Sequence, residues 1–585
     1  MKSRSSIAAL LVSALLGTSA VAAEGLSPEK TLPPAGAPIG AIHTEGESLL
    51  DFGGGPIAVD MRLVPTGDPE AGLPRGHVQG DFRGEDQPGF FPGVPELDAG
   101  AVEGPAPRPA PAAFGPGAPD APASPDAPGD ILRSFPGQAA SGWRPPDPVL
   151  AVGPRHVLEL VNSGFTIFTK DGGLERAYTD LETFFAPIRA VTPIPCTTAN
   201  CFVFDPRVTY SPFHGKYVMF ALARDDFNQR SYLFFAISTT DNPLGSWWQF
   251  FTFDPGGNDA WVDYSGMAVD PWGIYFTGNE FLWAGGFKHA LIVSLRPDVF
   301  NGTWNGGWIF TNLTWDEPGN PQAFDVQPAV TGFGFIPGGQ PTFFVNTFNS
   351  SGTKLCLWTL TGDRGNSPTL LKTDGTVSAY ADPGVARQPA PGADDIEMFY
   401  AGAQNVVYSE RHVYVALNDA GTDQSGFYVS KFNVDSSTEA RNLTYYTGGI
   451  YYYYPNVALV GDSETPMVGL AMSYSGDAQF VSGAVKLYEN FLIDASGDFW
   501  QTAGGSATYN SYVSGRNRWG DYMGAVRDHS CDTMWSVTQM APALNTWRTH
   551  IFAVAGVAPI TGTCALIFDD GFERGNSLNW SSTAL

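Results

Sequence analysis

A ten-residue phrase that occurs twice constrains the fold of this chain more than any other feature of its sequence. Residues 261–270 read W-V-D-Y-S-G-M-A-V-D, and residues 519–528 read W-G-D-Y-M-G-A-V-R-D. Both copies carry W-x-D-Y-x-G with a second Asp seven positions after the first. A phrase that returns with the same internal spacing marks an internal repeat, and a repeat decides the architecture of the whole chain.

Weaker versions of this phrase occur before and between the two copies. Each is a short apolar strand, a tight turn and a second apolar strand, with turns near residues 153, 211, 270, 332, 409, 461 and 528. The strands are rich in Val, Ile, Phe, Tyr and Trp and are separated by Gly, Pro, Asn and Asp. Units of this length, built from several short strands, are typical of propeller blades. The sequence therefore predicts an all-β, seven-bladed β-propeller, with an ordinary pair of β-sandwiches as the alternative.

The two ends of the chain differ from this repeat region. The first residues combine a basic start, an uncharged apolar run and small residues, as a secretory signal peptide does. The next part is rich in Pro, Gly and Ala and is expected to be an irregular leader and linker, with one strand at 56–63. A strand near 134–139 is expected to complete the last blade and close the ring. The predicted segments are a signal peptide (1–23), a leader (24–134), the propeller (135–557) and a tail (558–585).

The net charge and the apolar stretches of the sequence limit which partners and which cellular location we expect. The net charge is −27, with 59 acidic against 32 basic residues, which disfavours nucleic acid as a partner. No stretch after the signal peptide is long and apolar enough to span a membrane. We therefore expect a secreted bacterial protein, extracellular or at the cell surface, that is a monomer without a cofactor or a metal site.

The five cysteines fit an oxidising compartment. Cys196 and Cys201 bracket a four-residue loop and are predicted to form a local disulfide. Cys531 and Cys564 are predicted to tie the last blade to the tail. Cys356 lies in an apolar strand and is predicted to be buried and reduced.

Candidate site residues lie where the innermost strands begin, because these strand starts converge on one rim of a propeller channel. Asp147, Asp205, Asp263 and Asp521 lie at such starts. With neighbouring Arg and Tyr side chains, such carboxylates could hold a sugar, and two of them could act as acid and base in glycoside hydrolysis. The structural alternative is that each Asp accepts backbone N–H groups and caps a turn. The predicted ligand-binding residues are Asp205, Arg207, Asp263, Tyr264, Arg518, Asp521 and Tyr522, and no catalytic residue is assigned.

Three segments resemble known families. Residues 238–247, S-T-T-D-N-P-L-G-S-W, resemble the Asp-box hairpin of sialidase-like propellers, which is a fold element and implies no activity. Residues 518–523, R-W-G-D-Y-M, resemble a group of uncharacterised exported bacterial propellers, which implies a secreted propeller with no established reaction. The tail around D-G-F-E, residues 570–573, resembles an ending of exported gammaproteobacterial proteins and implies a surface or secretion context.

These observations predict a secreted propeller that binds extracellular glycans or a surface partner without catalysis of its own. The alternative is a glycoside hydrolase of the sialidase-like or arabinanase-like type that uses carboxylates at the channel mouth. A third possibility is a scaffold whose faces bind other proteins.

Overall fold

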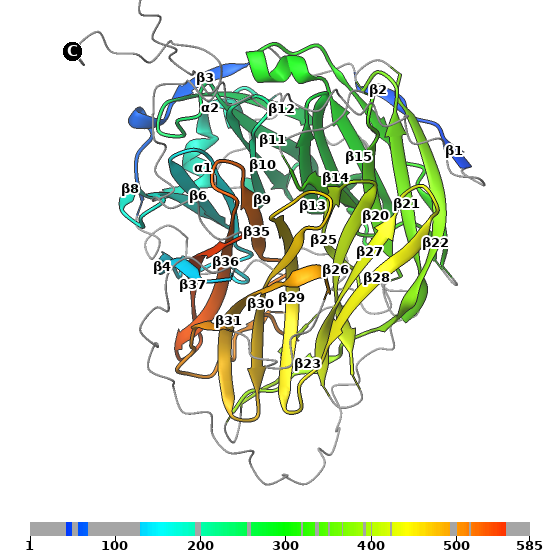
Figure 1. Cartoon of the computed structure of the whole chain (residues 1–585). Coiled ribbons are helices and arrows are strands. Elements are labelled where there is room, and N and C mark those ends of the chain that lie inside the picture. The colour runs from blue at the N-terminus through cyan, green and yellow to red at the C-terminus, as the bar shows by residue number, and fades with distance from the viewer. Residues whose placement is uncertain are drawn as a thin grey trace, which may run out of the picture.

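The computed structural model describes an all-β protein with a propeller-like arrangement of strands (Figure 1). The described residues are 42–49, 56–67, 129–192, 201–253, 259–317, 320–333, 339–348, 351–364, 367–389, 393–398, 400–421, 424–491, 500–513 and 516–556. Helices are confined to short turns such as α1 (Leu181–Phe184) and α2 (Ala186–Arg189). The predicted signal peptide and the tail 558–585 lie outside these ranges.

The repeat predicted from the sequence takes the form of antiparallel runs of four strands. The first three runs are β5 (Val149–Val152) to β8 (Leu174–Asp180), β9 (Cys201–Ser211) to β12 (Ser246–Phe253), and β13 (Ala260–Asp270) to β16 (Gly307–Phe310). Their middle strands are β6 (His156–Val161), β7 (Gly164–Thr169), β10 (Lys216–Asp225), β11 (Arg230–Ser238), β14 (Gly273–Leu282) and β15 (Phe287–Leu295).

The later runs follow the same plan. They are β19 (Gln327–Thr331) to β22 (Thr369–Ala381), β25 (Ala403–Ser409) to β28 (Thr438–Tyr445), and β29 (Ile450–Val460) to β32 (Trp500–Ala503). Their middle strands are β20 (Thr342–Thr347), β21 (Ser351–Thr361), β26 (His412–Ala420), β27 (Ser425–Asn433), β30 (Met467–Gly476) and β31 (Gln479–Tyr488). The last sheet has the order β35 (Gly524–Asp528), β36 (Thr533–Ala543), β37 (Thr546–Ala555) and β4 (Ile131–Ala139).

The number of blades does not follow from the sheets alone. The runs that begin with β19 and β25 belong to one nine-stranded sheet, because β19 pairs in parallel with β25 at Ala329–Val406 and the next two positions. The predicted count of seven therefore stays a prediction.

The first strand of each run lies at the centre of the molecule. One cavity of about 90 Å³ is lined by residues of β5, β9, β13, β19, β25, β29 and β35 together, so these strands surround a common channel. They are among the most buried elements, and all eleven residues of β13 are buried. Large aromatic side chains fill the wedges between neighbouring runs, for example Phe220 against Phe276 with ring centroids 4.3 Å apart.

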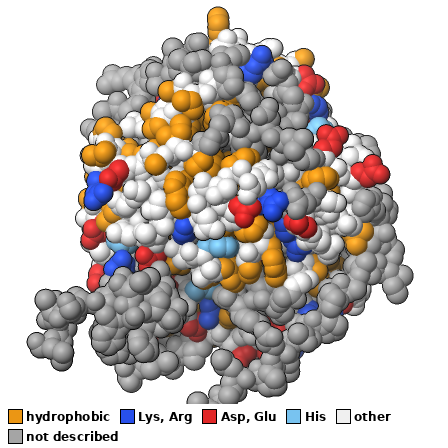
Figure 2. Space-filling view, turned by 90° about the horizontal axis from the view of Figure 1, so that it is seen from above, with side chains coloured by type: hydrophobic (Ala, Val, Ile, Leu, Met, Phe, Trp, Pro, Cys, Tyr) orange, Lys and Arg blue, Asp and Glu red, His pale blue; other side chains and the backbone are white. Residues whose placement is uncertain are grey.

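The face shown in Figure 2 carries acidic and basic side chains next to one another, and its hydrophobic side chains form several separate groups. Large exposed hydrophobic residues such as Phe227 and Leu544 are scattered singly, which is ordinary for a protein surface. Among the described residues, no helix is long and apolar enough to cross a membrane.

Two sequence motifs have structural roles. The Asp-box-like segment forms the hairpin between β11 and β12, where the fully buried Trp247 donates its indole N–H to the Pro243 carbonyl at 2.9 Å. Cys356 on β21 is buried, as predicted. Cys531 is a thiol and not part of a disulfide in this structure, so its predicted bridge to Cys564 is wrong. Cys196 lies outside the described residues, so the Cys196–Cys201 disulfide stays a prediction.

The ring is closed by a strand from the N-terminal side, as the sequence predicted. β4 pairs antiparallel with β37, the last strand of the repeat region, and lies beside it in Figure 1. We call this pair of strands the seam.

Glu159 on β6 contacts the seam from the neighbouring sheet. Its carboxylate accepts the Gln138 N–H at 3.0 Å and the Thr549 hydroxyl. Gly137 leaves room for Glu159, because a Cβ there would overlap both carboxylate oxygens.

The seam predicts a specific dependence of stability on pH. Burial raises the pKa of Glu159 to about 7, although its hydrogen bonds from Thr549 and Gln138 and the charge of Arg548 oppose the shift. Because the folded protein then holds a proton that the unfolded chain has released, this group's contribution to stability is complete at acidic pH. It falls as pH rises from the normal Glu range to about 7, by on the order of 3 kcal/mol. Glu159→Gln should remove this part of the slope in urea unfolding at pH 4.5 to 8. Glu175→Gln, an exposed carboxylate on β8, should leave it intact, and equal slopes in all three proteins would contradict the assignment.

The N-terminal leader is more ordered than the sequence predicted. β1 (Ile42–Thr44), β2 (Glu47–Leu49) and β3 (Ile57–Asp60) pair antiparallel with the outer strands β22, β16 and β12. Beyond β3 and the turn Met61–Leu63, Gly67 donates to the Tyr178 carbonyl on β8 at 2.8 Å. We call residues 42–49 and 56–67 the belt. It follows the outer edges of four successive runs in reverse chain order (Figure 1), and its backbone pairs with edges that would otherwise be open.

Arg176 on β8 binds the belt through hydrogen bonds. Its side chain is buried and donates to the carbonyls of Met61 at 2.8 Å and Val64 at 2.6 Å. Arg176→Ala removes the guanidinium donors from both oxygens, of which the Met61 oxygen keeps the Val64 N–H, and this should cost about 1–3 kcal/mol and expose the belt to proteases. Urea unfolding and limited proteolysis with mass mapping measure both effects. Arg62→Ala, which removes an exposed ion pair with Asp60 within the belt, is the matched control and should change neither.

Candidate functional site

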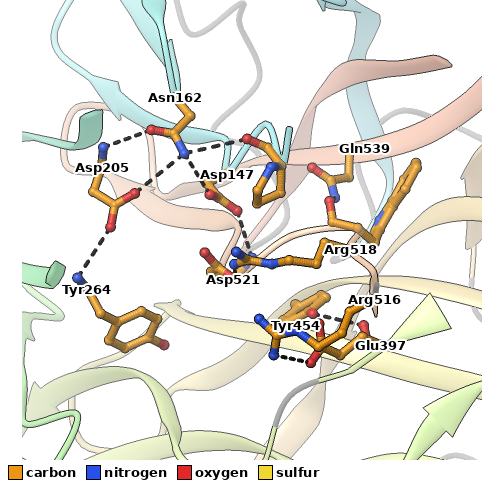
Figure 3. A network of polar contacts seen from close by, with 12 residues as sticks. Asp147, Asn162, Asp205, Tyr264, Glu397, Tyr454, Arg516, Arg518, Asp521 and Gln539 are labelled. Carbon is orange, nitrogen blue, oxygen red and sulfur yellow. Dashed lines mark hydrogen bonds and ion pairs between the residues drawn. The ribbon is translucent and has the colours of Figure 1, made fainter. Parts of the chain in front are cut away.

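Three polar side chains that lie far apart in the sequence meet where the innermost strands begin (Figure 3). The Asn162 amide donates to the carboxylates of Asp147 at 3.0 Å and Asp205 at 3.4 Å. Its carbonyl oxygen accepts the Asp205 backbone N–H at 2.8 Å. All three residues are buried, so this contact joins two neighbouring sheets beneath the surface.

The same contact recurs around the channel. Asn279 on β14 accepts the backbone N–H of Asp325 at 3.1 Å, and Asn418 on β26 accepts that of Tyr454 at 2.8 Å. The residue that donates in each case has a left-handed backbone, with φ of 45° at Asp205, 51° at Asp325 and 56° at Tyr454. Left-handed φ is rare outside glycine, and Asp tolerates it better than most residues. The Asn therefore supports a strained backbone position that lies within the next innermost strand, at Asp205 and Tyr454, or just before it, at Asp325.

This geometry corrects the equivalence between the Asp residues that the sequence suggested. In the first copy of the W-x-D-Y phrase the left-handed residue is Tyr264, with φ 49°, and not Asp263. Asp205 and Asp147 are thus the structural counterparts of Tyr264. The signal that sequence reasoning missed is an Asn near the end of the second strand, in L-V-N162, T-G-N279 and A-L-N418.

The carboxylates at these strand starts bind backbone N–H groups of the neighbouring sheets. Asp205 accepts the Tyr264 N–H at 3.3 Å, and Asp147 accepts the Asp521 N–H at 2.7 Å. Asp521 forms a buried ion pair with Arg518, with nitrogen and oxygen 2.6 Å apart. The structural alternative therefore describes Asp147 and Asp205 better than the sugar-binding one.

Two segments between the runs cover this end of the channel. β24 (Ile396–Glu397), which pairs with β23 (Val385–Ala386), touches Arg518 beside β34 (Arg516–Asn517) and β33 (Tyr512–Val513). Glu397 accepts the Arg516 guanidinium at 2.6 Å, and its carbonyl accepts the Tyr454 hydroxyl at 3.0 Å (Figure 3). A buried cluster that includes Trp519, Tyr509 and Trp547 packs around them. We call this end, at the starts of the innermost strands, the sealed end.

The predicted ligand-binding residues are mostly inaccessible in this arrangement. Asp205, Asp263, Tyr264, Arg518, Asp521 and Tyr522 are all buried, and Arg207 is half-buried. Six of the seven lie in connected contacts, in which Arg207 stacks on Tyr522 with its Cζ 3.3 Å from the ring centroid, and Tyr522 faces Tyr264. Asp263 differs from Asp521, because its carboxylate acts electrostatically on Arg224 rather than pairing with Arg518. A ligand role for these residues stays a prediction.

The opposite end of the channel, where the innermost strands turn into the second strands, holds the cavity of about 90 Å³. We call it the turn end. Its lining includes Tyr210, Phe213, Thr331, Arg527 and His529. Arg527 stacks 4.1 Å over the Phe333 ring and pairs with Asp532 at 2.7 Å. Burial, helped by the neighbouring Arg527, lowers the pKa of His529 to about 4, so the imidazole is neutral at ordinary pH.

The chemistry available at the two ends differs. At the sealed end the carboxylates of Asp147 and Asp205 accept backbone N–H groups and that of Asp521 pairs with Arg518, which leaves these three unsuited to proton transfer with a ligand. At the turn end the residues are aromatic, small or neutral, apart from the compensated Arg527. Within the described part of the chain, no group of three or more His, Cys, Asp or Glu side chains has the geometry of a metal site.

Comparison with known proteins assigns no family. No protein-family model matches the chain, and no curated protein matches it. Among solved structures, it is similar to a subtype N10 neuraminidase-like protein of A/little yellow-shouldered bat/Guatemala/060/2010, with a TM-score of 0.33 and 10% identity over 64% of this chain and 98% of that one. It is also similar to Trypanosoma rangeli sialidase, with a TM-score of 0.30 and 10% identity over 60% of this chain and 54% of that one. The chain thus spans about half of that sialidase, and neither likeness carries an argument about activity.

The hydrogen bonds at the sealed end predict a ranking of stability losses. Asp521→Ala removes the carboxylate from a buried ion pair and should lower the free energy of unfolding by about 3–5 kcal/mol. Asp205→Ala deprives the Tyr264 N–H and the Asn162 amide of an acceptor and should cost about 1–3 kcal/mol. Asp205→Asn, which keeps one acceptor oxygen, should cost less. Urea unfolding of the three variants gives the ranking, and an Asp521→Ala protein as stable as the wild type would refute a structural role.

Proposed function

We propose that this protein is a secreted, seven-bladed β-propeller that binds an extracellular glycan or a surface protein at the turn end of its channel, without catalysis. The count of seven is supported by the seven innermost strands that line one cavity, with the nine-stranded sheet taken as two blades. Secretion rests on the sequence of residues 1–23.

The observation that carries the binding proposal is the aromatic mouth at the turn end. Tyr210 and Phe213 line the cavity, and both side chains are half-buried, so part of each ring faces outward. Phe333, half-buried beneath Arg527, extends this surface. Aromatic rings offer large contact area with a polar edge, which suits both sugar faces and protein side chains.

The non-catalytic part of the proposal is supported by the state of the carboxylates. A glycosidase of the usual kind needs two carboxyl groups facing one substrate, about 5–10 Å apart. Asp147, Asp205 and Asp521 are buried and engaged at the sealed end. Near the turn end, Asp528 pairs with Lys170 at 2.6 Å and Asp532 pairs with Arg527. A glycoside hydrolase remains the alternative, to be decided by the experiment below.

The proposal predicts binding without turnover. The mature protein should bind members of a glycan array or of a panel of surface proteins. It should release no product from the glycans that it binds. Tyr210→Ala and Phe213→Ala should each weaken the affinity for a retained ligand by about tenfold, the factor that 1.4 kcal/mol represents. Phe227→Ala removes an aromatic side chain that is 80% exposed in the β10–β11 hairpin and is the matched control. Release of a sugar product would establish the hydrolase instead, and unchanged affinity in both mouth variants would refute this location.

A further inference from the structure

Arg207 on β9 has an unusual environment for a half-buried cation. Its Nε donates to the Ser265 carbonyl on the neighbouring innermost strand, and its guanidinium stacks on the Tyr522 ring at 3.3 Å. Its terminal nitrogens make no hydrogen bond to any described residue, and Nη2 is buried. No carboxylate in the described part of the chain forms an ion pair with it.

Three other arginines near the channel have acidic partners. Arg518 pairs with Asp521, Arg516 with Glu397 and Arg527 with Asp532, at nitrogen–oxygen distances of 2.6, 2.6 and 2.7 Å. In a chain with 59 acidic and 32 basic residues, an arginine left without an acidic partner is not explained by a shortage of carboxylates. A guanidinium withdrawn from water without a counter-charge is costly, so the position favours a bound anion.

The cavity at the turn end begins one residue beyond Arg207 on the same strand, and Arg207 itself is not among its lining residues. The next two residues, Val208 and Thr209, line the cavity of about 90 Å³, and Met267 and Asn405 line it from two other innermost strands. One water needs roughly 10–15 Å³ of such volume, so the cavity holds a small ion with several waters. Sites for ordinary small molecules begin near roughly 300 Å³, so a whole sugar ring is too large for it.

We propose that the channel binds a small monovalent anion, a halide or a short carboxylate, at the outward edge of the Arg207 guanidinium. Tyr522 occupies one face of the planar group, and Ser265 occupies the Nε edge, which leaves the terminal nitrogens to face the ion. Guanidinium presents paired donors in this plane and binds carboxylates and other anions through them. The ion enters from the turn end, because the other end is sealed. The proposal is independent of the glycan or protein ligand proposed above.

Chloride binding to the mature protein tests this site directly. The line width of the chloride-35 NMR signal should show saturable excess broadening with the wild-type protein. Arg207→Met, which keeps a long side chain against Tyr522 but no charge, should lose most of this broadening. Arg224→Met is the matched control, because Arg224 also stacks on an aromatic ring, Trp261 at 3.8 Å, but already pairs with Asp226. This control should broaden the signal as the wild type does.

Two further measurements keep the proposal falsifiable if Arg207→Met fails to fold. Bromide soaked into wild-type crystals should give an anomalous peak beside the Arg207 guanidinium. Addition of sodium formate separates the two anion classes: loss of the chloride broadening indicates a site that accepts short carboxylates, and its persistence indicates a halide site. Equal broadening in wild type and a folded Arg207→Met, or bromide bound only at Arg527 or on the outer surface, would overturn the proposal.

Discussion

The arrangement of the innermost strands depends on a hydrogen bond that recurs at three places between neighbouring sheets. An Asn near the end of a second strand accepts the backbone N–H of a residue with left-handed φ, which lies within or just before the neighbouring innermost strand, at Asn162–Asp205, Asn279–Asp325 and Asn418–Tyr454. Carboxylates extend the chain of contacts, through Asp205 to Tyr264 and Asp147 to Asp521. Sheets that pack face to face around an axis share few backbone hydrogen bonds, so these side chains help to fix how neighbouring sheets meet.

That use of polar residues determines where a ligand can bind. Buried carboxylates that hold backbone N–H groups cannot also face a substrate, and the segments around Glu397 and Arg518 cover them. The accessible part of the channel is therefore the turn end, where the lining is aromatic and aliphatic. Between the two ends lies Arg207, the one predicted ligand-binding residue that is not fully buried. The structure thus separates the strand-supporting network from the surfaces that can meet other molecules.

The outer edges of the sheets are stabilised in a different way. β4 pairs with β37 and joins the two ends of the repeat region, while the belt pairs with β22, β16 and β12. β4 and the belt both belong to the N-terminal part of the chain. Their backbones form hydrogen bonds with sheet edges that would otherwise be open to pairing with other strands. Arg176 and Glu159 connect them to the body of the protein through buried hydrogen bonds.

The sequence by itself determined the all-β class, the repeated strand–turn–strand unit and the closing strand near residues 134–139, because alternation of apolar residues and turn chemistry are local properties. It also indicated that the repeated Asp residues had a structural alternative. Tertiary structure alone decided which Asp residues are equivalent, since Asp205 corresponds to Tyr264 and not to Asp263, and this depends on backbone conformation and strand register. It alone decided that the leader pairs with three sheet edges, because its short strands gain their stability from partners up to 330 residues away, as in Ile42 with Lys372. The sealing of one channel end was likewise beyond sequence patterns, because it arises from contacts between segments that are distant in the chain, such as Glu397 and Arg516.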